Sequence, residues 1–234
     1  DEMHDMAEAS TDGMPEDGVK DTLDAYWREE YGFSRDFQKY VLEWIETVDT
    51  SVATVKRKDL VANETDLFMS FNYTDTLERV YGINGVLHIH GGVSSCADIP
   101  PIMGHGNREL INMYREKARV AQEEFVEWEE SICTAVADYE QSLYKDTGKI
   151  ILDNEVFFLS LSGIDRVVCF GLSFGDVDIP YLKRIDKAVK TTTKWEVYYH
   201  DAESCKTLKR VFEAVGISKK HEISFLQSNS FWDK

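Results

Sequence analysis

The chain has 234 residues, of which 43% are hydrophobic and 12% aromatic, enough to bury the core of one sizeable α/β domain or two small ones. Its 43 acidic and 26 basic residues leave a net charge of −17, which repels phosphate backbones and anionic membrane surfaces, so nucleic acids and membranes are not expected partners. Four widely spaced cysteines without a Cys-x-x-Cys pair favour a reduced, cytoplasmic chain over a disulfide framework or a zinc motif.

The predicted elements begin after an acidic segment. Residues 1–21 are rich in acids, contain Gly and Pro, and are predicted to be a disordered lead-in or linker. Residues 22–234 are predicted to form one α/β domain. Within it, residues 22–48 have apolar side chains at helical spacing and are predicted to be helical.

The segment Ser70–Gly92 predicts one β-α-β unit. A short apolar run at 66–71 has the length of a strand and is followed by Asn72. A helix that Thr74 can cap and Gly82 can end comes next. The stretch "GVLHIHGG" then reads as a second strand that glycine stops.

A helical insertion is predicted at about 109–163, with one or two helices at 109–145 and another near 154–161. The remaining predicted elements are a strand at 166–170, a helix opened by Asp178 and Pro180, a strand at 194–201, a helix at 203–216 and a strand at 221–227.

This order of elements predicts an α/β, Rossmann-like fold, with a largely parallel sheet and helices on both faces. Ligands of such sheets bind beyond the carboxyl ends of the strands. Polar residues follow four of the predicted strands: Asn72, His90, Ser173 and the pair His200-Asp201. The sequence therefore predicts a ligand site at that edge of the sheet.

His88 and His90 alternate with Ile89 on a predicted strand, so both side chains are expected on the same face. They could form a paired metal site, or His90 could act as a base near neutral pH. The alternative is a buried, structural role for either ring. The two glycines after His90 let the backbone approach a ligand closely, which favours function there.

Four further groups lie at loops or helix starts. The amide of Asn72 can orient a water or a ribose hydroxyl, although a turn-forming Asn is equally expected. Asp75 can accept a hydrogen bond from a ribose or complement the helix dipole. Gly171 and Ser173 suit a ribose or phosphate loop, but the full Gly-x-Gly-x-x-Gly pattern and the Walker lysine are absent. His105 lies between two glycines, which leaves either role open.

Four motifs occur in one order: "SFNYTDTLERVYG", "HIHG", "MGHGN" and "GLSFGDVDIPYLKRI". From about Asp66 to its end, the chain resembles the AbiH family of bacteriophage abortive-infection proteins. That family is in turn distantly similar to sirtuin-like NAD-binding domains. The resemblance implies phage resistance, with NAD as substrate or ligand and cleavage of its nicotinamide glycosidic bond as the activity.

Applied residue by residue, the resemblance implies catalytic roles for Asn72, which would orient water or ribose, and His90, which would be the general base. Stabilisation of an oxocarbenium-like centre needs positioning more than a strong nucleophile. No metal ligand is implied. The implied cofactor-binding residues are Asp75, His105, Gly171, Ser173 and Asp178.

One part of the family pattern is absent from the chain. The family begins with a strand and a Gly-Asn-Gly-Phe-Asp loop, at the position where sirtuin-like domains seat the pyrophosphate, and nothing before Asp66 matches it. Either the chain is a fragment that lacks the first strand of its sheet, or the dinucleotide loop is missing. The expected partners are a nucleotide and either the missing N-terminal part or another defence protein, and a homo-oligomer stays open.

Two other functions stay open beside the glycohydrolase. The chain could be a catalytically silent nucleotide sensor that acts through its helical insertion. It could also be a metal-dependent hydrolase that uses His88, His90, His105 and the His200-Asp201 pair. A deacylase is not distinguished from a glycohydrolase, because both would use the same Asn and His.

Overall fold

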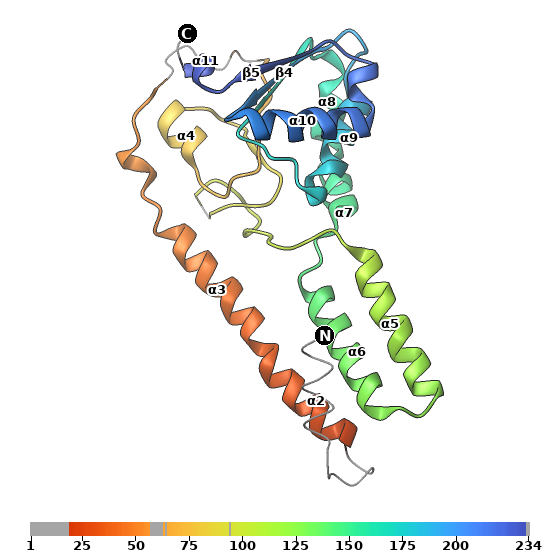
Figure 1. The fold of residues 1–234 in the computed structure, drawn as a ribbon. Coiled ribbons are helices and arrows are strands. Elements are labelled where there is room, and N and C mark those ends of the chain that lie inside the picture. Colours follow the sequence, from red (N-terminus) through yellow and green to blue (C-terminus); the bar gives the residue numbers. More distant parts are fainter. Residues whose placement is uncertain (1–18, 57–62, 64, 94, 233–234) are drawn as a thin grey trace. The chain divides into compact units, whose positions relative to one another are not determined.

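The computed structural model describes residues 19–56, 63, 65–93 and 95–232, so the predicted lead-in lies outside the described residues up to position 18. The chain divides into two compact units (Figure 1). The first comprises residues 1–44 and 103–145, and the second comprises residues 45–102 and 146–234. None of the described helices is long and apolar enough to cross a membrane.

The first unit is helical. Its elements are α2 (Val19–Glu30), most of α3 (Gly32–Glu46), α5 (Arg108–Glu123) and α6 (Glu127–Ser142). Helices α5 and α6 run side by side, and α2 packs on α6 (Figure 1). Leu23 and Trp27 of α2 are buried against Ile132 of α6, and the Ser131 hydroxyl donates to the Asp24 carboxylate over 2.5 Å. The apolar faces of amphipathic helices therefore form this core.

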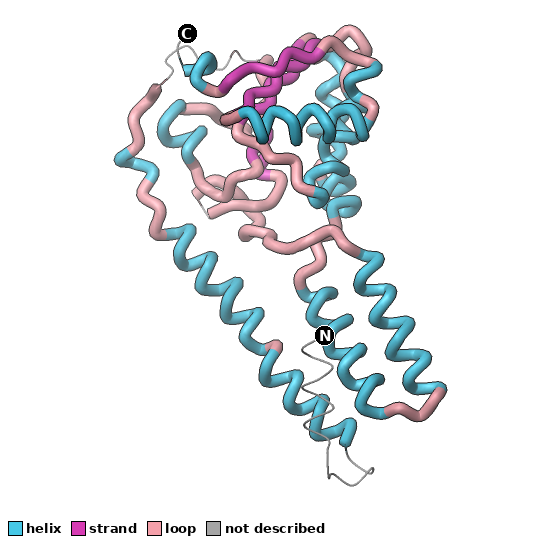
Figure 2. The backbone as a smooth tube through the Cα atoms, viewed as in Figure 1, coloured by secondary structure: helices cyan, strands magenta, loops and turns pink. Residues whose placement is uncertain are grey.

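The second unit contains all the strands that the structure describes, and Figure 2 shows them in magenta. Strands β1 (Met69–Ser70) and β2 (Leu87–His88) pair in parallel, and β3 (Arg166–Phe170), β4 (Lys194–Tyr199) and β5 (Ile223–Gln227) form a parallel sheet in the order β3-β4-β5. The α-helices of this unit are α4 (Thr76–Tyr81), α7 (Thr147–Asp153), α8 (Glu155–Ser160), α9 (Ile179–Ala188), α10 (Ala202–Val215) and α11 (Asn229–Trp232).

Both crossover helices of the larger sheet pack on the same face. Right-handed crossovers from β3 to β4 and from β4 to β5 run in one direction across the sheet, which places α9 and α10 on one side. Trp195 and Val197 of β4 accordingly share one buried core with Leu182 of α9 and Phe212 of α10. On the smaller sheet, Leu87 faces the same core.

The opposite face of the larger sheet is covered at one end by α11. The ring of Phe231 lies 4.4 Å from that of Phe170 and 5.0 Å from that of Tyr198, measured between centroids. Val168 on the same face is 43% exposed. The α/β class with parallel strands is therefore confirmed; α9 and α10 cover one face of this sheet, and among the described residues the short α11 covers part of the other.

The order of elements is the predicted one, β1-α4-β2 and then β3-α9-β4-α10-β5 with helices between them. Strand β3 has the predicted bounds, and α9 has Asp178 at its N-cap and Pro180 in its first turn. Helix α10 ends at Gly216, whose φ of 85° is left-handed. Caps and apolar runs are local signals, which explains this agreement.

Other local predictions were wrong. The N-cap residue of α4 is Asp75 and not Thr74, whose hydroxyl bonds that of Thr76. Strands β1 and β2 have two residues each, shorter than predicted. The predicted helix at 22–48 is divided between α2 and α3. Within the span predicted as an insertion, 109–163, helices α7 and α8 contact α9 in the second unit.

Candidate functional site

Two of the sequence-predicted site residues meet in the second unit. His90 follows β2, and Asp178 is the N-cap residue of α9. The His90 Nε2 atom lies 3.5 Å from the Asp178 Oδ1 atom. The fold thus joins an imidazole and a carboxylate from distant segments, as expected at the carboxyl ends of parallel strands.

The imidazole of His90 is 6% exposed and contacts two aromatic rings. Its centroid lies 5.2 Å from that of Phe71 and 5.4 Å from that of Tyr181. Tyr181 comes three residues after Asp178, so α9 presents both side chains on one face. The Tyr181 hydroxyl is buried without a hydrogen-bond partner among the described residues. Burial, together with the charges of Asp178 and Asp146, raises the pKa of this phenol.

The glycine after His90 is required by a close approach of two backbone segments. Gly91 has a φ of 72°, and a Cβ atom there would lie 2.3 Å from the Pro100 carbonyl oxygen. The Ile102 amide donates to the His90 carbonyl over 2.8 Å, and the Tyr73 hydroxyl donates to the Ile102 carbonyl over 3.2 Å. The segment around Pro100 therefore fixes the turn that holds His90.

His88 and His90 do not act as a pair, and the prediction that they share a face was wrong. His88 Nε2 lies 2.8 Å from Glu78 Oε1 of α4, and His88 Nδ1 donates to the Asn72 carbonyl over 3.0 Å. Strand β2 ends at His88, and the Gly91 amide closes a turn onto the His88 carbonyl. The alternation of a strand therefore stops before His90.

Asn72 combines a fixed backbone with an exposed side chain. The backbone N–H of Asn72 donates to the Ser70 hydroxyl over 3.1 Å, and the backbone carbonyl of Asn72 accepts from His88 Nδ1. An amide side chain held in this way can be oriented toward a ligand without a large loss of backbone entropy.

Asp75 is buried and has three donors around it. Thr50 and Ser95 donate their hydroxyls to its carboxylate over 2.6 and 2.7 Å, and Arg79 Nε lies 2.9 Å away. Burial raises the pKa of Asp75, but the hydrogen bonds from Thr50 and Ser95 and the charge of Arg79 lower it by more, so the pKa lies below its usual value. These contacts hold the start of α4, and a ribose contact of Asp75 stays a prediction.

We expect Asp75→Asn to lower the free energy of unfolding at neutral pH by about 1.5–3 kcal/mol, the contribution of a hydrogen bond to a charged group. Because the folded pKa is depressed, the carboxylate stabilises the chain above the unfolded pKa of ~3.9, and this stability is lost as the pH falls through the folded pKa. Urea unfolding from neutral to acidic pH should show the parent and variant converge. A difference in unfolding free energy between parent and variant that stays constant down to acidic pH would contradict a depressed pKa of Asp75.

The predicted loop residues Gly171 and Ser173 are exposed after β3. Gly171 has a φ of 70°, which suits a tight turn. Phe174 is buried at 4% exposure although its φ of 51° is unusual for a bulky residue. The turn therefore buries Phe174 and leaves Ser173 exposed.

His105 lies in the first unit, and the other predicted cofactor residues belong to the second. Its Nε2 atom lies 2.9 Å from Glu140 Oε2, and its Nδ1 atom accepts from the Asn107 amide over 3.1 Å. These bonds tie the start of α5 to α6. A nucleotide contact of His105 stays a prediction.

In the part of the chain that the structure describes, no group of three possible metal ligands contains His90, His105 or His200. Among the described residues, only Glu78, His88 and Cys96 offer three possible metal ligands close together, with donor atoms within 4.8 Å of one another. His200 is exposed and lies 3.6 Å from Asp201, measured from Nδ1 to Oδ2.

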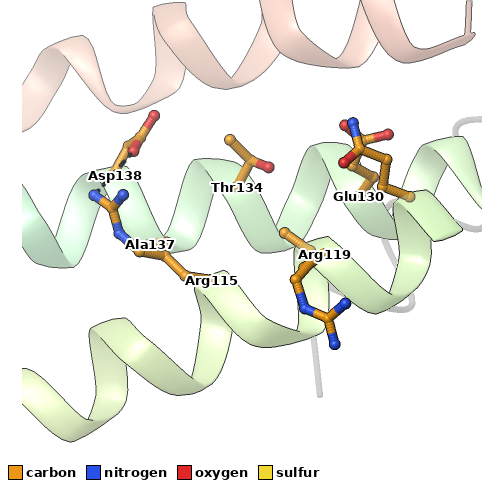
Figure 3. Close-up of a pocket in the computed structure, with 8 residues that line it drawn as sticks. Arg115, Arg119, Glu130, Thr134, Ala137 and Asp138 are labelled. Carbon is orange, nitrogen blue, oxygen red and sulfur yellow. Dashed lines mark ion pairs between the residues drawn. The ribbon is translucent and has the colours of Figure 1, made fainter.

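A shallow pocket of about 280 Å³ lies in the first unit (Figure 3). Its walls come from α5 and α6, and Arg115 and Asp138 form an ion pair across it with 3.9 Å between nitrogen and oxygen. None of the sequence-predicted site residues lines this pocket, which is therefore distinct from the His90 cluster.

Sequence reasoning missed Tyr73, Tyr181 and Glu78. The i, i+3 spacing from Asp178 could have indicated Tyr181, and the i, i+4 pattern of α4 could have indicated Glu78. It also missed the buried His221, whose Nε2 atom lies 3.0 Å from Asp186 Oδ1. That pair joins the start of β5 to α9.

A family model described as bacteriophage abortive infection AbiH matches residues 3–199. The resemblance carried by the four motifs begins at about Asp66, whereas the match to the family model begins upstream of that residue. The match ends at the last residue of β4. No curated protein and no solved structure matches the chain significantly.

Proposed function

The chain belongs to the AbiH family of bacteriophage abortive-infection proteins, and from this premise we propose that it hydrolyses the nicotinamide glycosidic bond of NAD. The observation that supports this proposal is the pairing of the buried His90 with the partly buried Asp178: His90 follows β2 in the same β-α-β unit as the exposed Asn72, and Asp178 caps α9. A buried imidazole beside a carboxylate is suited to general-base chemistry.

In the proposed reaction, a water molecule attacks C1′ of the nicotinamide ribose. The bond from C1′ to the ring nitrogen breaks, its electron pair neutralises the pyridinium, and nicotinamide leaves. The imidazole of His90 takes the proton from water, so the products are nicotinamide, ADP-ribose and a proton.

Other predicted site residues would divide the remaining tasks. The carboxylate of Asp178 would orient the ring and stabilise the imidazolium that forms. The side chain of Asn72 would orient the water or a ribose hydroxyl. The exposed backbone after β3, at Gly171 and Ser173, would hold the nucleotide.

A silent nucleotide sensor is the second candidate. It is favoured by the packing of the His90 ring against Phe71 and Tyr181, which a purely structural histidine would also show. A sensor would bind NAD through the loop after β3 without releasing nicotinamide.

The direct test is incubation of the purified chain with NAD, with free nicotinamide followed by chromatography. Asn72→Ala should lower kcat by about 10²–10³-fold, the cost of losing one positioned donor, and change KM much less. Asn84→Ala, another exposed Asn of the same β-α-β unit, is the matched control and should retain the rate.

Equal losses in kcat and in nucleotide affinity would assign Asn72 to binding alone. Absence of nicotinamide release from the parent, with NAD binding retained in calorimetry, would favour the sensor. Absence of both would reject NAD as the ligand.

A further inference from the structure

A cluster of one nitrogen, one oxygen and one sulfur ligand lies beside α4, on the side of β2 opposite the core. Glu78 comes from α4, His88 from β2, and Cys96 from the turn after Gly92. A donor atom of each lies within 4.8 Å of the others. We propose that Glu78, His88 and Cys96 bind one zinc ion.

The chemistry of the set favours zinc. Thiolate, imidazole and carboxylate together are ligands that zinc accepts, whereas magnesium and calcium prefer oxygen alone. Ligand atoms around a tetrahedral zinc lie roughly 3.3–3.6 Å apart, given metal–ligand bonds of about 2.0–2.3 Å. His88 Nε2 lies 2.8 Å from Glu78 Oε1, Cys96 Sγ approaches the other ring nitrogen, Nδ1, at 4.0 Å, and a donor atom of each residue lies within 4.8 Å of the others, so small movements of Glu78 and Cys96 would bring the ligand atoms to these distances.

His88 is oriented as a metal-binding histidine would be, because one ring nitrogen is held by a hydrogen bond and the other is directed at a possible second ligand. Its Nδ1 atom donates to the Asn72 carbonyl over 3.0 Å, which leaves Nε2 directed at Glu78. Histidines that bind metals commonly donate their second ring N–H to a backbone carbonyl or a carboxylate. Zinc would therefore enter between His88 and Glu78 without disturbing the bond to Asn72.

A second observation points independently to a cation. The Glu78 Oε2 atom is buried and has no hydrogen-bond partner among the described residues. Leaving a buried carboxylate oxygen without a partner costs free energy. A divalent ion would satisfy it.

Carbonyl oxygens line the surroundings of the Cys96 sulfur, which favours a cation there. Its sulfur faces the carbonyls of Val93 and Tyr73, at 3.4 and 3.8 Å. Gly92 provides the space for it, because a Cβ atom at that position would lie 2.9 Å from the sulfur. A glycine thus allows the turn to bring Cys96 to His88. One isolated cysteine gives no spacing signal, so the sequence did not reveal this cluster.

The test uses the full chain, freed of metal with a chelator and titrated with Co²⁺ as a spectroscopic substitute for Zn²⁺. We expect one equivalent to bind, with a sulfur-to-cobalt charge-transfer band that Zn²⁺ abolishes. Cys96→Ser should remove the band, and Glu78→Gln should weaken Zn²⁺ binding by at least ~100-fold, since loss of a supporting residue alone costs 10–100-fold. Cys205→Ser removes a partly exposed cysteine elsewhere and should change nothing.

A band that survives in Cys96→Ser, a band lost in Cys205→Ser, or binding of less than one equivalent by the parent would overturn the proposal. Circular dichroism without metal establishes that each variant folds. If Cys96→Ser fails to fold, the titration of Glu78→Gln decides. None of these readouts involves NAD, so a failure of the proposed hydrolysis and a failure of the zinc site are separate results.

Discussion

His90→Gln should lower the rate of nicotinamide release by about 10²–10⁴-fold, the usual contribution of a positioned general base. Glutamine can reach the position of the Nε2 atom and keep a contact with Asp178, but its amide does not accept a proton. The loss should therefore appear in kcat rather than in the affinity for NAD. Single-turnover release of nicotinamide measures it directly.

Alanine would be a poorer replacement at this position. The His90 ring is buried against Phe71 and Tyr181, so truncation would leave a cavity as well as remove the base. His200→Gln is the matched control, because that histidine also follows a strand but is exposed. If His90→Gln folds like the parent and turns over NAD at the parent rate, His90 is not the base.

The sequence was sufficient to predict the order of strands and helices in the second unit. The signals are local and mutually consistent: an apolar run at β3, proline in the first turn of α9, and Gly216 at the end of α10. Such patterns depend on a few neighbouring residues and need no knowledge of the tertiary contacts.

The faces of the sheet were harder to predict, because they depend on strand order. Helices on both faces were expected from the alternation of strands and helices alone. The order β3-β4-β5 makes both crossovers run in the same direction, which places α9 and α10 on one face, and the short α11 covers part of the other. Strand order is set by contacts between distant residues, which a single sequence does not reveal.

The surroundings of His90 were predicted only in part, for a related reason. The position of His90 at a strand end identified it, the family resemblance implied Asp178, and the fold brings the two together. The aromatic neighbours of His90 were not predicted, because Tyr181 reaches it only once α9 packs on the core. The roles assigned to Asn72 and His90 stay predictions until turnover is measured.

Gly91→Ala should lower the free energy of unfolding of the second unit by about 2–5 kcal/mol. A side chain at a left-handed φ costs about 1–2 kcal/mol, and forcing an extra methyl into a packed site adds about 1–3 kcal/mol. Both terms apply here, since φ is 72° and the new Cβ would lie 2.3 Å from the Pro100 carbonyl oxygen. Backbone atoms yield less readily than a flexible side chain, so the turn itself must move.

Gly85→Ala separates the two terms. Gly85 has a nearly identical φ of 73°, but nothing lies within 4 Å of its Cβ position, so only the conformational cost of about 1–2 kcal/mol should remain. Urea unfolding gives the two free energies, and hydrogen exchange at the Ile102 amide, which is bonded to the His90 carbonyl, reports the local opening. Faster exchange of the Ile102 amide in Gly91→Ala alone would show that the close approach of Pro100 holds His90 in place. Equal losses of unfolding free energy in both variants would mean that only the left-handed conformation matters.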